Sequence, residues 1–176
     1  MVTNFDIATP HALSDNTQKI VHDFEQLGID DKLAVLYWAY EKMGDSITPA
    51  APTSADPRIA PILLDDFYQL SGDDQLAVMR DIASKKDTEY SRAYGALTAN
   101  NQLVVWCAWA IDMGDRVIDI PNDYQANEAS KNVLNQLEQL EFQDQISVLR
   151  QIAIDMGYNP VQGTPTQAET GKTPSL

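Results

Sequence analysis

Acidic side chains are the commonest titratable groups in this sequence, and they form adjacent pairs at Asp30–Asp31, Asp65–Asp66 and Asp73–Asp74. Paired carboxylates can bind a divalent cation, but a calcium-binding loop alternates its acidic ligands and ends on a glutamate. None of the three pairs has that arrangement. We therefore interpret them as helix caps and solvated helix faces, since aspartate stabilises the first turn of a helix.

Nucleophiles and general bases are scarce. Cys107 is the only cysteine, which excludes an intrachain disulfide, favours a reducing compartment and, in its apolar stretch, indicates a buried side chain. His11 and His22 are the only histidines. Glycine-rich phosphate loops, a GxSxG motif and an HExxH motif are absent from the sequence. The sequence therefore predicts a protein that is not an enzyme and holds no metal.

Apolar side chains concentrate in two stretches, 33–40 and 103–111, where they cover every side of a predicted helix. All three tryptophans, Trp38, Trp106 and Trp109, lie there. A helix that is apolar all round must be enclosed by other helices or by an apolar ligand. On composition alone a helical core is the commoner explanation. The alternative is a tunnel for a long, flat ligand, which aromatic and methionine side chains suit.

An internal duplication organises the chain around these two stretches. Leu27 and Leu70 each begin a similar segment, and both map onto Leu97 and Leu140 by one shift of 70 residues. The shift also pairs the two apolar stretches with each other. The sequence thus predicts two related halves, about 17–86 and 90–157.

Each repeated segment is typical of a helix start. Ser71 and Thr98 are good N-caps, whereas Glu141 at the equivalent place is a poor one. Glycine follows methionine at Gly114 and Gly157, as at a helix C-terminus. Apolar residues between these signals keep helical spacing, and no run alternates with a period of two. We therefore predict an all-α fold of about eight helices, four in each half.

Charge and hydropathy exclude several classes of protein. The net charge is −14, from 12 basic and 26 acidic residues, which opposes general binding to nucleic acids or to anionic membranes. The longest apolar run, 103–111, is too short to span a bilayer, and the N-terminus has no signal-peptide pattern. Prolines break the helical pattern at 47–52 and 117–121, and the segment 159–176 is predicted to be a flexible polar tail.

Several motifs together resemble a known family. They are LAVLYWAYEKMG and TPAAP within 33–52, NNQLVVW at 100–106, Ile-Pro followed by Tyr124, and QISVLRQIAIDMG at 145–157. These residues resemble the N-terminal helical domain of the orange carotenoid protein family of cyanobacteria. The resemblance covers nearly all of 1–158 and implies two interleaved four-helix bundles. Because the chain ends at Leu176, we expect the stand-alone helical branch of this family.

The resemblance implies one noncovalent ketocarotenoid (canthaxanthin, echinenone or 3'-hydroxyechinenone) along the axis between the halves. It places Tyr40 and Trp106 on the two faces of one terminal ring. The remaining candidates line the tunnel, Tyr37 and Trp109 being added from the apolar stretches: Leu33, Leu36, Tyr37, Met79, Leu103, Trp109, Met113, Ile120, Tyr124 and Ile146.

The resemblance also implies partners. Arg150, and with it Asn100, matches positions that contact a second domain or the phycobilisome in the family. Asp23 is acidic where well-known members are basic, and a reversed charge on a contact face weighs against phycobilisome docking. Arg80 stands where those members have cysteine. We expect a cytoplasmic protein, in contact with phycobilisomes if it docks on them.

Three functions remain open on the sequence. The first is photoprotection, through quenching of singlet oxygen and of phycobilisome excitation. The second is a carotenoid carrier that accepts pigment from a partner resembling the absent C-terminal domain. The third is a pigment-free acidic adaptor that binds a partner peptide in a groove. Aromatic and methionine residues on all-round apolar helices favour pigment over adaptor, because an adaptor would carry them on an exposed stripe.

Overall fold

The structure is a computed structural model that describes residues 13–43 and 61–160. The predicted linker at 47–52, the glycine at 44 and the predicted tail beyond residue 160 lie outside these ranges. Within them the chain is helical and has no strand, apart from one isolated bridge between Met113 and Val117. The prediction of an all-α fold is confirmed.

Seven α-helices and one irregular helical segment make up the described part of the chain. Their bounds are α1 Asp15–Glu25, α2 Ile29–Met43, the π-helix η3 Ile62–Asp66 continued by the 3-10 helix η4 Phe67–Gln69, α3 Gly72–Ala83, α4 Glu89–Gly95, α5 Ala99–Ile111, α6 Glu128–Glu138 and α7 Phe142–Ile154.

The caps at the repeated starts follow the sequence expectation. The Ser71 hydroxyl accepts a hydrogen bond from the Asp74 amide, and the Thr98 hydroxyl accepts one from the Asn101 amide. Glu141 stands at the start of α7 but its side chain makes no such bond. Each hydroxyl satisfies an amide that a helix start leaves without an intrahelical partner. Side-chain capping therefore fixes the starts of α3 and α5, whereas α7 begins without it.

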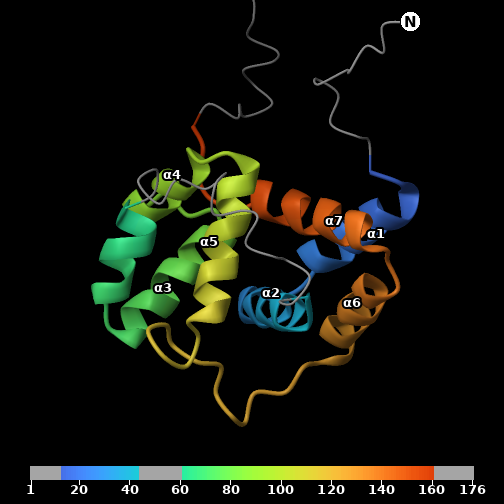
Figure 1. The fold of residues 1–176 in the computed structure, drawn as a ribbon, viewed down its shortest axis with the longest axis horizontal. Helices are drawn as coiled ribbons and strands as arrows, with labels where there is room; N and C mark the ends of the chain where they lie inside the picture. The colour runs from blue at the N-terminus through green and yellow to red at the C-terminus, as the bar shows by residue number, and fades with distance from the viewer. Residues whose placement is uncertain (1–12, 44–60, 161–176) are drawn as a thin grey trace, which may run out of the picture.

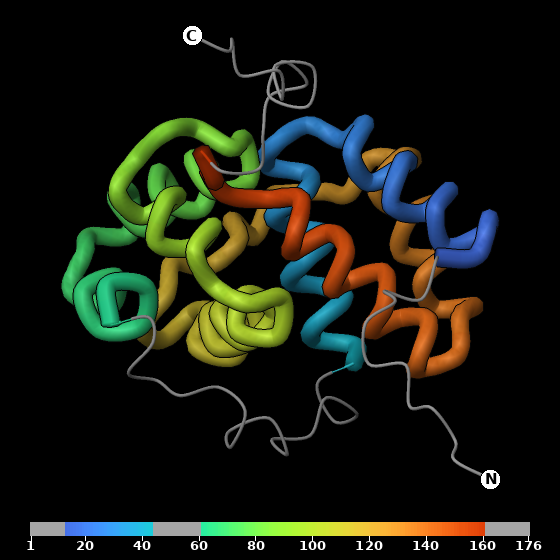
Figure 2. Tube along the Cα trace, turned by 90° about the horizontal axis from the view of Figure 1, so that it is seen from above, coloured from blue at the N-terminus to red at the C-terminus, as the bar shows by residue number. Residues whose placement is uncertain are grey.

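The helices form two interleaved four-helix bundles (Figure 1). The first bundle contains α1, α2, α6 and α7; the second contains η3–η4, α3, α4 and α5. In Figure 2, α1 and α7 run side by side within the first bundle. Each bundle takes two helical elements from 17–86 and two from 90–157, so the predicted interleaving is confirmed. The bundles meet where α2 packs against α3 and α5, and where α5 packs against α7.

The 70-residue shift relates the two bundles to each other. It maps the start of α2 at Ile29 onto that of α5 at Ala99, and the start of α3 at Gly72 onto that of α7 at Phe142. It also maps η3–η4 onto α6. The shift therefore exchanges the bundles, and residues 70 apart occupy equivalent places on opposite sides of the seam.

The segment 62–69 departs from the α-helix expected from its apolar spacing. Its first turn is a π turn, in which the Phe67 amide donates to the Ile62 carbonyl. The irregular turns leave backbone acceptors for side chains of the second bundle. The Leu63 carbonyl accepts from Trp109 Nε1 at 3.1 Å, and the Phe67 carbonyl accepts from Gln75 Nε2 at 3.3 Å. Leu63 and Phe67 are both fully buried.

The apolar stretch of α5 is less enclosed than its composition predicts. Val105, Trp106 and Trp109 are buried, but Ile111 is 77% exposed and Cys107 is only partly buried. Enclosure of the whole helix was therefore the wrong expectation for the described residues. One face of α5 belongs to the core, and its other face is only partly buried.

Candidate functional site

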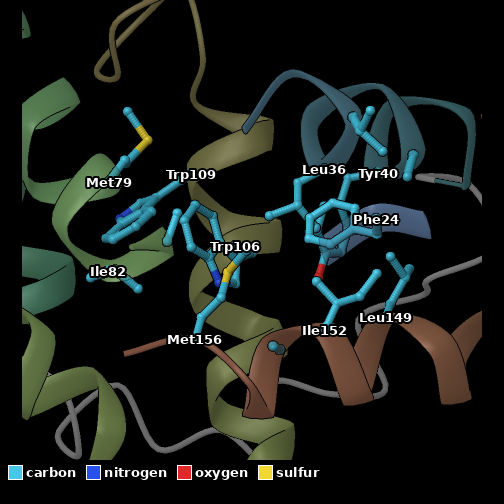
Figure 3. Packing of buried hydrophobic residues seen from close by; sticks show 14 of the residues in the cluster. Phe24, Leu36, Tyr40, Met79, Ile82, Trp106, Trp109, Leu149, Ile152 and Met156 are labelled. Carbon is cyan, nitrogen blue, oxygen red and sulfur yellow. The ribbon is translucent and has the colours of Figure 1, made fainter. Parts of the chain in front are cut away.

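A cavity lies at the seam between the bundles, against α2, α3 and α5 and beneath the segment 118–124 that follows α5. Its volume is about 160 Å³. Figure 3 shows Trp106 at the centre of this region, with Met79 and Trp109 on one side and Leu36 and Tyr40 on the other. The cavity walls are Leu33, Ala34, Leu36, Tyr37, Tyr40, Leu76, Met79, Trp106, Trp109, Ala110, Met113, Ile118, Ile120, Pro121 and Tyr124, with Asp30, Arg80 and Asp119 among them.

Every residue proposed from the sequence to bind the pigment lines this cavity, except Leu103 and Ile146. These two are partly buried and pack against the core from α5 and α7. The Leu103 carbonyl accepts a hydrogen bond from Tyr40 Oη at 3.4 Å. The 70-residue shift maps Leu33 onto Leu103 and Leu76 onto Ile146. The two outliers are thus the counterparts of two residues that do line the cavity.

Hydrogen bonds fix the orientation of Trp106 and Trp109, the two tryptophans that line the cavity. Trp106 Nε1 donates to Tyr94 Oη at 2.8 Å, and Tyr94 Oη donates to the Ala153 carbonyl at 2.6 Å. Trp109 is held by its bond to the Leu63 carbonyl and stacks on Phe67, with 4.2 Å between ring centroids. Buried indoles need such acceptors, and the bonds leave their flat carbon faces for packing. The cavity therefore has a rigid aromatic wall.

Tyr40 supplies an aromatic wall from the first bundle. Its side chain is buried, and desolvation holds the pKa of the phenol well above its ordinary value. The phenol is therefore neutral at physiological pH, and its hydroxyl reaches a backbone carbonyl rather than the cavity. Burial likewise raises the pKa of the half-buried Cys107 thiol, which stays protonated. Neither side chain is therefore present as the anion that a nucleophile requires.

A charged pair stands at the rim of the cavity. Arg80 donates from Nε and Nη2 to the two carboxylate oxygens of Asp30, at 2.8 and 2.9 Å. These hydrogen bonds lower the pKa of Asp30. The Asp30 side chain is 53% exposed and that of Arg80 is 48% exposed, so both face water as well as the cavity.

The segment that covers the cavity is anchored at both ends. Tyr124 Oη and Asn127 Nδ2 both donate to the Asp31 carboxylate near the start of α2. Burial and this bond raise the pKa of Tyr124 to about 12. At the other end, buried Gln75 donates to the Arg116 carbonyl at 2.9 Å and accepts from the Ile118 amide at 2.8 Å. Side chains of α2 and α3 thus hold the cover in place.

Asp30, Leu76 and Arg80 were missed by the sequence reasoning. The signal that identifies them is the duplication itself, because the 70-residue shift maps them onto Asn100, Ile146 and Arg150. These three were all singled out from the sequence. Applying the shift to the candidate set would have predicted Asp30, Leu76, Arg80 and Ala110, but not Ala34, Ile118, Asp119 or Pro121, which also line the cavity.

The counterparts in the second half differ in their polar contacts. Arg150 is partly buried, and its Nε makes no hydrogen bond to a described residue. Asn100 is exposed and carries no charge with which to pair. The two arginines thus have different surroundings, although the backbone places them equivalently.

Two further observations limit the chemistry of the described residues. No described helix is long and apolar enough to cross a membrane. No group of three His, Cys, Asp or Glu side chains in 13–43 and 61–160 is arranged to hold a metal ion.

Comparison with known proteins points to one family. The family model described as "Orange carotenoid protein, N-terminal" matches residues 10–159. An orange carotenoid-binding domain-containing protein of Nostoc sp. (strain PCC 7120) is 40% identical over 160 residues, covering 90% of this chain and 94% of its own. The orange carotenoid-binding protein of Limnospira maxima is 33% identical, and the match covers 77% of this chain but 43% of that protein.

Solved structures agree with these matches. The Orange Carotenoid Protein of Anabaena (Nostoc) sp. PCC 7120 binding canthaxanthin superposes with a TM-score of 0.78 at 32% identity, covering 88% of this chain and 50% of that one. The Red Carotenoid Protein of the same organism binding canthaxanthin gives a TM-score of 0.72 at 27% identity, covering 81% and 99%.

Proposed function

Because the chain belongs to the family of orange carotenoid protein N-terminal domains, we propose that it binds one ketocarotenoid noncovalently between its two bundles and serves in photoprotection rather than catalysis. The observation that carries this proposal is the cavity at the seam, whose walls are almost wholly apolar, aromatic and methionine side chains. Such walls suit a flat conjugated ligand. Canthaxanthin, echinenone and 3'-hydroxyechinenone are the candidate pigments.

The residues divide between ring and polyene. Tyr40 and Trp106, from α2 and α5, would take the two faces of one terminal ring. Pockets for small ligands have about 300–1,000 Å³, which exceeds the 160 Å³ of this cavity. A long polyene must therefore extend along the seam, where Leu103 and Ile146 face it in the second half. The ligand would join the bundles and stabilise the fold by mass action.

The protein's contribution to photoprotection is to exclude water and fix the pigment geometry. The pigment itself supplies the photophysics, which is the quenching of singlet oxygen. Quenching of phycobilisome excitation would need docking as well. The acidic Asp23, which pairs with Lys19 at 2.6 Å and accepts from Gln136 at 3.1 Å, stands where well-known members are basic, and this difference in charge on α1 weighs against docking. Singlet-oxygen quenching is therefore the part of the proposal that needs no partner.

A carrier role is the second candidate, and Arg150 is the observation that favours it. Its side chain is partly buried and its Nε bonds to no described residue; a carboxylate of a docking protein would satisfy this donor once the side chain turns toward the surface. Asn100, which is equivalent to Asp30 under the 70-residue shift, would lie in such an interface. A pigment-free adaptor is less favoured, because the aromatic residues of α2 and α5 line an internal cavity and not an exposed stripe.

Expression with and without a ketocarotenoid supply tests the proposal. We expect an orange to red protein only with pigment, with absorption shifted from that of the free carotenoid and a higher melting temperature than the colourless form. The isolated chain should also shorten the lifetime of photosensitised singlet oxygen. Folded protein that remains colourless in several pigment-supplied preparations would exclude pigment binding.

A further inference from the structure

The Asp30–Arg80 pair is unusual because it borders an apolar cavity. A second, similar pair lies elsewhere: Arg92 donates to both carboxylate oxygens of Asp87, and it borders no part of this cavity. The two pairs have comparable exposure, with arginine side chains 48% and 55% exposed. Exposed ion pairs contribute only about 0–1 kcal/mol to stability. The position of Arg80 at the rim therefore needs a reason other than folding energy.

Arg80 retains hydrogen-bonding capacity at this rim. A guanidinium has five N–H donors in a fixed plane, and Asp30 occupies Nε and one side of Nη2. Nη1 makes no hydrogen bond to any described residue, and Arg80 is one of the residues that line the cavity. Asp30 holds the guanidinium plane in place and balances its charge. The pair is thus a pre-oriented donor beside an apolar chamber.

A ligand that fills the cavity must cover part of this donor. A hydrocarbon ring would remove water from Arg80 without replacing its hydrogen bonds, which is costly for a polar group. A ring that carries a carbonyl oxygen would accept from Nη1 and restore the bond.

We propose that Arg80 determines specificity, by donating a hydrogen bond to a ketone oxygen on the terminal ring that reaches the rim of the cavity. This inference rests on the proposed pigment binding and adds to it the group that distinguishes a ring ketone from an unsubstituted ring. Asp30 acts as a positioning residue, because it orients Arg80 and does not itself donate to a ketone.

Competition between two pigments tests the inference. Canthaxanthin, with a ketone on each ring, and β-carotene, with none, are offered in equal amounts, and the bound ratio is measured by extraction and chromatography. The variants are Arg80→Met, which keeps an apolar stem, Asp30→Asn, and the matched control Arg92→Met. We expect the preference for canthaxanthin to fall about three- to tenfold in Arg80→Met, as for the loss of one hydrogen bond, to fall less in Asp30→Asn, which keeps the donor but loosens its orientation, and to persist in Arg92→Met.

Each outcome is decisive. Unchanged preference in Arg80→Met, or an equal loss in Asp30→Asn and Arg80→Met, overturns the inference, the second because the pair would then act only by holding α2 to α3. An equal loss in Arg92→Met also overturns it, since any surface arginine would then have the effect. If the wild-type protein binds both pigments without preference, the proposed role of Arg80 is wrong but pigment binding stands. If it binds neither pigment, the proposed function itself is wrong.

Discussion

The two halves share a backbone plan but not the side chains that face the seam. Where the first half has Tyr40, the second has Ala110; where the second has Trp109, the first has Ala39. The same large-for-small exchange pairs Leu36 with Trp106. At these equivalent positions, a large residue in one half therefore corresponds to a smaller one in the other, so the two halves present different shapes to the seam. Duplication supplied the frame, and divergence between the halves shaped a single cavity.

The polar contacts at two further pairs of equivalent positions also differ between the halves. The first half pairs Asp30 with Arg80, while the second has Asn100 and an Arg150 whose Nε meets no described acceptor. Arg80 is paired with a carboxylate of its own chain, whereas Arg150 Nε has no hydrogen bond to a described residue. The two halves therefore differ in the polar contacts of their equivalent arginines.

Removing the large member of an unequal pair should have the largest effect. Trp106→Ala deletes the indole that lines the cavity and bonds to Tyr94. Such core truncations cost about 3–5 kcal/mol of unfolding free energy. We expect that loss in denaturant titration of the pigment-free protein, together with low pigment yield and a shifted absorption maximum.

Two control variants distinguish the loss of the cavity wall from a general loss of core packing. Trp106→Phe keeps an aromatic face and should retain pigment. Phe24→Ala truncates a residue that is 2% exposed in the first bundle and does not line the cavity, so it should lose similar stability but keep the pigment spectrum. Trp38 is a poorer control, because its ring packs near that of Tyr124, with 6.1 Å between the ring centroids. Normal pigment binding in Trp106→Ala would contradict the site.

The glycines after α5 and α7 give the next largest contrast. Gly114 and Gly157 both adopt left-handed backbone, with φ of 83° and 78°. A Cβ at Gly157 would lie 2.5 Å from Tyr94 Cδ1, whereas one at Gly114 would come no nearer than 3.3 Å, to the Asp119 carboxylate. Left-handed backbone costs an alanine about 1–2 kcal/mol. Gly114→Ala should lose that much and Gly157→Ala clearly more, measured by thermal unfolding.

The reason for the difference is the position of Gly157 between the bundles. Its amide donates to the Ile82 carbonyl at 2.8 Å, and its backbone lies against the ring that holds Trp106. Displacing Tyr94 would therefore disturb the aromatic wall, and Gly157→Ala should also lower pigment yield. Equal destabilisation in both variants would indicate that backbone strain alone matters at the two helix ends.

Much of the fold was accessible from the sequence because its signals are local. Ser71 and Thr98 mark helix starts, and the duplication relates the halves. The π turn before Phe67 was not accessible, since Leu63 and Phe67 have the spacing of an ordinary helix. What selects it is Trp109, 46 residues beyond Leu63, which needs a backbone acceptor. Such a contact depends on tertiary structure and leaves no local pattern.

The candidate site shows the same division. Apolar wall residues were found from the apolar stretches and the family resemblance. The link from Tyr124 to Asp31 joins residues 93 apart, and the Arg80–Asp30 pair joins residues 50 apart. Polar pairs of this kind carry no periodicity, so sequence reasoning missed their partners even where it named one member.

Exchanging the residues at positions 30 and 100 should have the smallest effect on stability, and it tests most directly whether the two halves are equivalent there. Asp30→Asn gives the first half the residue of the second, and Asn100→Asp does the reverse. The pKa of Asp30 is lowered by Arg80, so the pair stabilises the fold above the ordinary carboxyl pKa and is lost as pH falls through the lowered value. For an exposed pair the change is at most about 1 kcal/mol.

Thermal unfolding from neutral to acid pH measures both exchanges. Asp30→Asn should lower stability slightly at neutral pH and remove part of the loss seen on acidification. Asn100→Asp should add stability at neutral pH that disappears in acid, because the new carboxylate would satisfy the buried Arg150 Nε. If Arg150 docks a partner's carboxylate, this variant should also weaken pigment transfer from a carotenoid-loaded donor while Asp30→Asn does not. No stabilisation by Asn100→Asp would mean that the two arginines are not equivalent and that the rims diverged in backbone as well as in charge.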